Sequence, residues 1–321
     1  MLKEFRRDRF LFLKYNLVII LLTSLASLAL LFTTSSIIAT PNSWILFLCI
    51  LPLCFPNLWS ILLSALSLVM AGTLLSLFSL SAWDLLWIPL GVFVGLQSAY
   101  LMHNAAHENI RPKWFNRVVG EICGMQQLMG FPAWAVPHVI HHQFPDDPEK
   151  DPHPPDHLPF LQFLSQMGLF MGRIVQKNYF EQWGDNETSR RDWKRMVHTS
   201  TVSRFTRSAF LLLLLGPKVF VLCFMVSKVI NAVWYAHFNY FTHRPAADGK
   251  MEILNLDHNW YYKLVNATMA GVYYHKNHHF KPILFDPRKL DRTLEEPLVS
   301  FVYKNEVETD GIEEQSEPVS L

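Results

Sequence analysis

The sequence predicts an all-helical, polytopic integral membrane protein with a helical cap on the cytosolic side of the bilayer. Of its 321 residues, 50% are hydrophobic and only 17% are charged, whereas soluble domains carry about a quarter charged residues. Asp84 is the only charged residue from Tyr15 to Met102, a stretch several times longer than the ~20 apolar residues that span a bilayer. The 28 basic and 27 acidic residues nearly cancel, which leaves no electrostatic basis for binding nucleic acid.

The chain begins with a basic segment. Residues 1–14 contain five basic and two acidic residues, and the positive-inside rule places such a segment in the cytosol. Four apolar segments are expected to follow, at 15–38, 44–57, 59–80 and 84–102. The second of these is short and contains Pro52 and Pro56, so we expect a tilted or re-entrant span there.

The chain becomes polar after His103, and it includes an amphipathic stretch at 160–175 that we expect to lie in the membrane interface. A further apolar block at 208–238 is interrupted by Gly216–Pro217, which predicts two helices joined by a tight turn. Two crossings there return the chain to its starting side, so the polar segments on both sides of this block are expected to meet on the cytosolic side.

Nine of the fourteen histidines fall into four compact patterns. These are His103-Asn-Ala-Ala-His107, His138-Val-Ile-His141-His142, Asn239-Tyr-Phe-Thr-His243 and His275-Lys-Asn-His278-His279. With 14 histidines in 321 residues, far fewer than one H-x-x-H-H is expected by chance, and this chain has two.

The spacing of these histidines has a direct geometric meaning. Helix positions i and i+4 share a face, whereas the middle histidine of H-x-x-H-H is rotated by about 100° from the last one. One such motif can therefore supply ligands to two neighbouring metals, and nine imidazoles suit two ions better than one. Iron, zinc, copper and nickel all accept neutral imidazole, so the spacing alone leaves the metal open.

Each pattern taken alone also has a plainer explanation. His103 and His107 could be an interfacial pair at a helix end, and the pattern ending at His243 is weak by itself. The two H-x-x-H-H copies beside apolar spans favour a metal site, because ionisable groups at membrane depth usually serve a function. The other histidines are expected in surface or supporting roles: His153, His157, His198, His237 and His258.

The order of these motifs between paired hydrophobic blocks resembles the membrane fatty acid desaturase superfamily, which also contains carotenoid hydroxylases and ketolases. The run Asp146-Asp-Pro-Glu-Lys-Asp-Pro152 is similar to the acidic segment of that family, and His243 resembles its additional histidine before the last motif. The resemblance covers roughly residues 59–290. The first motif departs from it, because Asn104 stands where many members have aspartate.

The resemblance implies an O2-dependent oxidoreductase with two iron ions that acts on a C–H bond of a lipid. The implied iron ligands are His103, His107, His138, His141, His142, His243, His275, His278 and His279. The residues expected to orient these ligands by hydrogen bonds are Asn104, Asn239, Asp147 and Asp151. A slot for the lipid is expected among nearby aromatic residues: Tyr100, Trp134, Trp234, Tyr235, Tyr273 and Tyr274.

The resemblance also predicts the partners and the organisation of the chain. The substrate would be a fatty acyl chain or a carotenoid, and electrons would come from an external donor of the ferredoxin, rubredoxin or cytochrome b5 type. The short loops and the lack of an evident organelle signal, rather than the resemblance, favour a multi-pass position in a bacterial inner membrane over the endoplasmic reticulum. The expected parts are a basic cytosolic N-terminus (1–14), extra transmembrane segments (15–57), a desaturase-like catalytic domain (58–290) and an acidic cytosolic tail (291–321).

The sequence is therefore compatible with three functions. A lipid desaturase is the leading hypothesis. A hydroxylase or ketolase of the same fold is the closest alternative, because the outcome depends on substrate placement that the motifs do not encode. A membrane metal transporter is a distant third, since transport predicts ligands near the membrane midplane, whereas these histidines lie at the ends of apolar segments.

Overall fold

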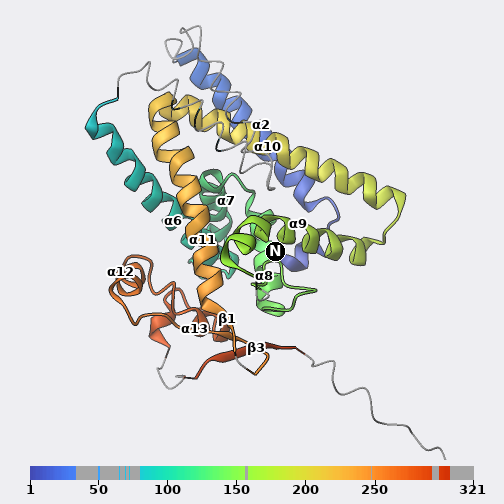
Figure 1. Cartoon of the computed structure of the whole chain (residues 1–321). Helices are drawn as coiled ribbons and strands as arrows, with labels where there is room; N and C mark the ends of the chain where they lie inside the picture. Colours follow the sequence, from blue (N-terminus) through green and yellow to red (C-terminus); the bar gives the residue numbers. More distant parts are fainter. Residues whose placement is uncertain are drawn as a thin grey trace, which may run out of the picture.

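The computed structural model describes residues 1–33, 50, 65, 69, 72, 80–155, 158–246, 248–290 and 296–303. This part of the chain is mostly helical (Figure 1). Three of its helical stretches are long and apolar enough to cross a membrane: Leu11–Phe32, Ala82–Ala106 and Glu187–Thr242. The predicted helical membrane fold is thereby confirmed. The apolar segments expected at 44–57 and 59–80 lie, apart from a few residues, outside the described residues, as does the chain after Tyr303.

The apolar helices form one end of the molecule (Figure 1). Helix α10 packs along α2, and α6 packs against α11 and the π-helical turn η3. Their approach is close, because a Cβ atom on Gly91 of α6 would lie 1.9 Å from the carbonyl oxygen of Cys223 in η3. The bounds of these elements are α2 Leu11–Thr33, η2 Ala82–Leu86, α6 Trp87–Ala106, α10 Glu187–Val219, η3 Phe220–Val226 and α11 Ser227–Thr242; the short helix α1, Leu2–Phe5, precedes them.

The tight turn predicted at Gly216–Pro217 is present. Gly216 has φ of +73° and ψ of 163°, a conformation open to glycine because it has no Cβ atom. Pro217 follows and cannot donate a hydrogen bond back to the preceding turn. The chain therefore reverses here, and Figure 1 shows α11 descending from the end of α10.

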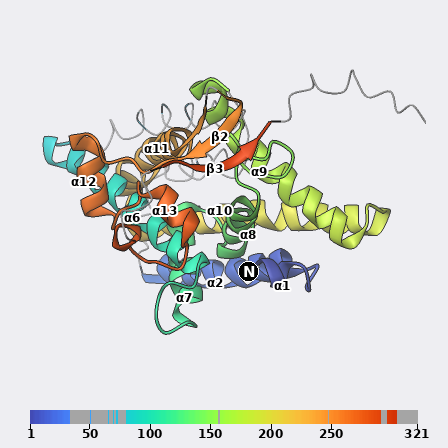
Figure 2. The same ribbon diagram turned by 90° about the horizontal axis from the view of Figure 1, so that it is seen from below.

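The other elements form a cap at the lower end of α6 and α11 (Figures 1 and 2). The basic N-terminal segment takes part in it, since Leu2 and Phe5 are buried in one apolar cluster with Val136 and Tyr179. The bounds of the cap helices are α7 Phe115–Gln127, α8 Phe131–Gln143, α9 Phe160–Trp183, α12 Trp260–Thr268, α13 His275–Phe280 and the 3-10 turn η4 Pro287–Lys289.

A small antiparallel sheet adds a feature that the all-helical prediction did not contain. Its strands are β1 His243–Pro245, β2 Lys250–Ile253 and β3 Leu298–Val302, in the order β1-β2-β3. Strand β3 belongs to the segment 291–321 that the sequence assigned to an acidic tail. Met251 pairs with Phe301 and Glu252 with Val299, so Ser300 is the extra residue of a β-bulge. Bulges of this kind redirect a side chain.

We expect Gly91→Val to destabilise the protein by about 1–3 kcal/mol, because overpacking forces the backbone of η3 away from α6. Thermal unfolding of the purified protein in detergent measures this effect as a lowered Tm. The matched control is Gly172→Ala in α9, where no atom of the described residues lies within 4 Å of the new methyl group. Helix propensity favours alanine there by about 1 kcal/mol. Equal Tm values for the two variants would contradict the packing described for α6.

Candidate metal centre

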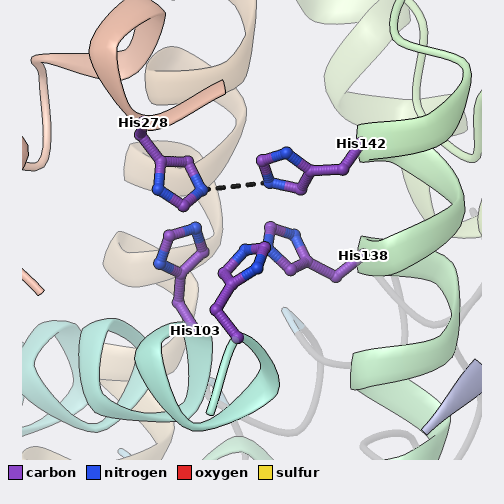
Figure 3. A group of neighbouring side chains, drawn as sticks. His103, His138, His142 and His278 are labelled. Atoms are coloured by element: carbon purple, nitrogen blue, oxygen red, sulfur yellow. Dashed lines mark hydrogen bonds between the residues drawn. The ribbon is translucent and has the colours of Figure 1, made fainter. Parts of the chain in front are cut away.

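The nine histidines of the four patterns come together where the apolar helices meet the cap. His103 and His107 stand at the C-terminal end of α6, and His138, His141 and His142 occupy the last turns of α8. His243 directly follows α11 as the first residue of β1. The short helix α13 carries the last three: His275, His278 and His279. Figure 3 shows side chains from α6, α8 and α13 pointing toward one another.

These histidines form two groups, each with ligand atoms within 4.8 Å of one another. In the first, the Nε2 atoms of His107 and His138 are 2.8 Å apart. Those of His142 and His278 are 3.0 Å apart, and the dashed line in Figure 3 marks this contact. Two ligands bound at right angles to one metal, with bonds of about 2.1 Å, are separated by roughly 3 Å. The first cluster is His103, His107, His138, His142 and His278.

The second cluster has the same spacing. The Nε2 atom of His275 lies 3.0 Å from that of His243 and 3.1 Å from that of His279. Its members are His141, His243, His275 and His279. The rings of His142 and His279 stack at a centroid distance of 4.2 Å, so the two clusters share a wall.

Each H-x-x-H-H motif is divided between the clusters, as its helical spacing predicts. On α8, the first and last histidines face the first cluster and the middle one, His141, faces the second. On α13 the assignment is reversed, because His278 faces the first cluster and its two companions face the second. The two helices therefore present complementary faces to one site.

Two buried carboxylates hold histidines of the second cluster. The Nδ1–H group of His141 donates to Asp151 at 2.8 Å, and that of His243 donates to both oxygens of Asp146 at 2.9 Å. Asp146 is 0% exposed and Asp151 is 1% exposed. The amide of Asp146 also donates to Asp151, at 2.6 Å. With Nδ1 engaged in this way, each ring turns its Nε2 lone pair toward the cluster.

The electrostatics of the cap keep most of these imidazoles neutral. Burial lowers the pKa well below its ordinary value, and repulsion among the rings adds to this effect, for His138, His142, His275, His278 and His279. Burial also disfavours the charged form of His141, but Asp151 outweighs it and raises the pKa of this ring. Desolvation likewise opposes ionisation of Asp151, yet its charge and hydrogen-bond interactions with His141 bring its pKa down to about 2. Neutral imidazole is the ligating form.

Three residues that the sequence named as supports contact other groups. Asp147 accepts a hydrogen bond from the amide of Glu149 and lies 3.5 Å from Lys150, so its neighbour Asp146 takes the supporting role that had been expected of it. The amide group of Asn104 bonds to the Tyr100 carbonyl and to Asn109. The Nδ2 atom of Asn239 donates to the carbonyl of Tyr235.

The histidines outside the four patterns have varied surroundings. His153 is buried, and its ring lies against His141 with Asp151 beside it, a proximity that the spacing Asp151-x-His153 could have indicated. His237 bonds to the hydroxyl of Tyr273. His198 and His258 are exposed, and His157 lies outside the described residues.

Several ring nitrogens in the clusters lack hydrogen-bond partners among the described residues, as expected of atoms that bind a metal. Within the part of the chain that the structure describes, both ring nitrogens of His103 and the Nε2 atom of His141 are buried without a hydrogen-bond partner. A buried polar atom without a partner costs free energy, and metal coordination would remove that cost. All donors are nitrogen atoms, which suits iron, zinc, copper or nickel.

An apolar pocket of about 260 Å³ runs from the histidines between α6 and α11. Four of the six predicted aromatic residues line it, namely Tyr100, Trp134, Trp234 and Tyr235. Histidines of both clusters line it as well, among them His103, His138, His275 and His278. Tyr273 and Tyr274 are not among its lining residues. A long apolar molecule in this pocket would therefore contact the metal-binding histidines.

The fold and the site define a helical membrane protein in which two histidine clusters lie at one end of an apolar pocket. Residues 78–284 match the family described as fatty acid desaturase. Since the match covers well over half of the chain, the protein belongs to the fatty acid desaturase family and is a desaturase-like oxidoreductase. Searches of curated proteins and of solved structures found no match.

Ser300 lies outside the matched residues and still reaches the site. The bulge in β3 turns its hydroxyl toward Asp146, to which it donates a hydrogen bond. Asp146 in turn holds His243. Asp146 itself has φ of +62°, a conformation that is unfavourable for a residue with a side chain, so its position depends on such bonds.

We expect Ser300→Ala to weaken zinc binding at the second cluster about tenfold, the lower end of the effect seen for groups that orient metal ligands. Titration of metal-free protein with zinc against a colorimetric chelator measures this. The control is Ser165→Ala, because the Ser165 hydroxyl donates to the Gln162 carbonyl within its own helix. The connection from β3 to the site is refuted if both variants bind zinc like the unaltered protein.

Proposed function

We propose that the protein is an O2-dependent lipid desaturase with two iron ions held by the nine histidines. The first cluster would hold one iron and the second cluster the other. The nitrogen-only ligand sets, the spacing of about 3 Å between ring nitrogens and the unsatisfied atoms of His103 and His141 support this assignment. Membership of the desaturase family supports iron over the other metals.

When bound, the irons would supply the oxidising power that removes hydrogen from an unactivated methylene with O2 as co-substrate. The chain's own residues perform the remaining tasks. Asp146 and Asp151 hold His243 and His141 in one tautomer. Trp134 stacks on His138 at a centroid distance of 4.7 Å, which fixes that ring and covers it with an apolar surface. Water is thereby kept from the reacting carbon.

The observation that carries the proposal is the pocket that ends on the histidines. Its lining is mostly apolar, with Met167, Met171, Phe238 and Met269 beside the aromatic residues. Flexible methionine side chains adapt to a long chain. Such a pocket would hold an acyl chain with one methylene against the clusters, and this positioning is the main contribution that a protein makes to a metal-based reaction.

The proposal extends to the partners. An external donor of the ferredoxin, rubredoxin or cytochrome b5 type would deliver electrons to the cap, where α13 and the sheet lie at the lower end of the molecule in Figure 1. The basic residues of segment 1–14 support a cytosolic position for this cap.

The metal assignment predicts that neighbouring histidines serve different irons. We expect His278→Ala and His279→Ala each to lower the iron content of the purified protein from two ions to about one, because each removes a ligand from only one cluster. Elemental analysis gives the content. His198→Ala changes an exposed histidine on α10 and should leave it unaltered. Full iron loading of both α13 variants would overturn the ligand assignment.

The reaction is tested by expression in a host of known lipid profile, followed by mass spectrometry of total lipids. New double bonds are expected, and they should be absent with His278→Ala, because the first cluster then lacks one of its five ligands. New hydroxyl or keto groups would instead identify the hydroxylase or ketolase alternative. If the purified protein contains no iron and carries zinc into vesicles, the protein is a transporter.

A further inference from the structure

The end of the pocket away from the histidines is polar, although it lies within the apolar helices. Lys228, Asn231 and Tyr235 line it from α11. These positions are i, i+3 and i+7, so they occupy one face of the helix. Gln127 lines the same pocket from the end of α7.

Two of these side chains carry buried polar atoms without partners. Asn231 is 4% exposed, and its Oδ1 atom has no hydrogen-bond partner among the described residues. The hydroxyl of Tyr235 is also buried, and no residue in the described part of the chain forms a hydrogen bond with it. Buried polar atoms are nearly always hydrogen-bonded in folded proteins. Two such atoms without partners, on residues that line one pocket, therefore indicate that a polar group of a ligand binds there.

Lys228 adds a positive charge to this group. Its ammonium donates to the Gln127 carbonyl at 2.9 Å, at the C-terminal end of α7. This contact occupies one of its three N–H groups and leaves its charge without a carboxylate among the described residues. The charged neighbour that acts on Lys228 is another cation, Arg204.

The acids of the apolar region are already engaged. Asp84 lies 3.1 Å from Lys218, and Glu121 lies 3.5 Å from Arg207. Residues 34–79 contain no acidic residue. A charge inside a membrane requires an opposite charge or several hydrogen bonds. Among the described residues, Lys228 has one hydrogen bond, to the Gln127 carbonyl, and lies 6.0 Å from the ring centroid of Phe224. The missing counter-charge is therefore expected from the molecule that fills the pocket.

We propose that this polar end binds the carboxylate of a fatty acid, whose hydrocarbon chain runs along α11 to the histidines. Lys228 donates to the carboxylate, and the hydroxyl of Tyr235 lies on the same helix face below it. Phe238, which packs against His275 at 4.7 Å between centroids, is ten residues further along, or about 15 Å at the helical rise. An extended chain covers this span with on the order of a dozen single bonds, since an extended backbone covers about 3.4 Å with three.

The inference rests on the proposed function for the identity of the pocket as the substrate site, but its test does not require turnover. Binding of tritiated hexadecanoate to the full-length protein in detergent is compared with its displacement by unlabelled hexadecanol and methyl hexadecanoate. Lys228→Gln keeps a donor for the Gln127 carbonyl and removes the charge. We expect it to weaken hexadecanoate binding at least tenfold and to change hexadecanol binding less than threefold.

Two further variants separate charge from structure. Lys228→Arg restores a cation and should keep hexadecanoate binding within threefold of the unaltered protein. Lys218→Gln removes a lysine that pairs with Asp84 and does not line the pocket, so it should bind all three lipids normally. Tm values confirm that each variant is folded.

The proposal is overturned if Lys228→Gln binds hexadecanoate as tightly as the unaltered protein. It is overturned equally if the variant's affinity for hexadecanol falls as much as its affinity for hexadecanoate. It is also overturned if the unaltered protein binds no hexadecanoate. Charge-dependent binding with an unchanged lipid profile in expressing cells would instead refute the desaturase function and leave the carboxylate site intact.

Discussion

The burial of nine imidazoles in one small volume is the constraint on which the rest of the structure depends. Each ring nitrogen taken from water needs a partner, and in this cap the nearest groups are mostly other imidazoles at about 3 Å. Desolvation keeps most of the rings uncharged, which limits their mutual repulsion. The cap therefore has to close around the histidines and also leave their lone pairs converging on common points, as metal coordination requires.

The two clusters meet this constraint in different ways. The second has two buried carboxylates, Asp146 and Asp151, which are joined by a backbone hydrogen bond and fix two of its four rings. The first has five histidines, and Trp134 stacks on one of them. The second cluster is thus positioned by buried negative charge. The first is positioned by aromatic packing and has one more histidine. Because carboxylates stabilise a more positive metal, the two ions would differ in their preference for the oxidised state.

The sequence predicted the part of the site that depends on helical periodicity. The i, i+4 spacing of His103 and His107 and the division of each H-x-x-H-H follow from 3.6 residues per turn. Periodicity does not extend to the loop after α8, where the positive φ of Asp146 decides which of two adjacent aspartates faces inward. It also gives no sign of β3, because the contact of Ser300 with Asp146 depends on a bulge between strands about fifty residues apart.

The pocket joins two regions that the sequence presents as separate. Helix α11 begins near the charge of Lys228 and ends at His243, so one rigid element sets the distance between Lys228 and the histidine clusters. Rigid helices hold such distances better than loops do. A lipid anchored at one end can place only a narrow range of its carbons against the clusters. The position of oxidation would then be set by the length of α11 between these two residues, and the histidines would contribute reactivity without selecting the carbon.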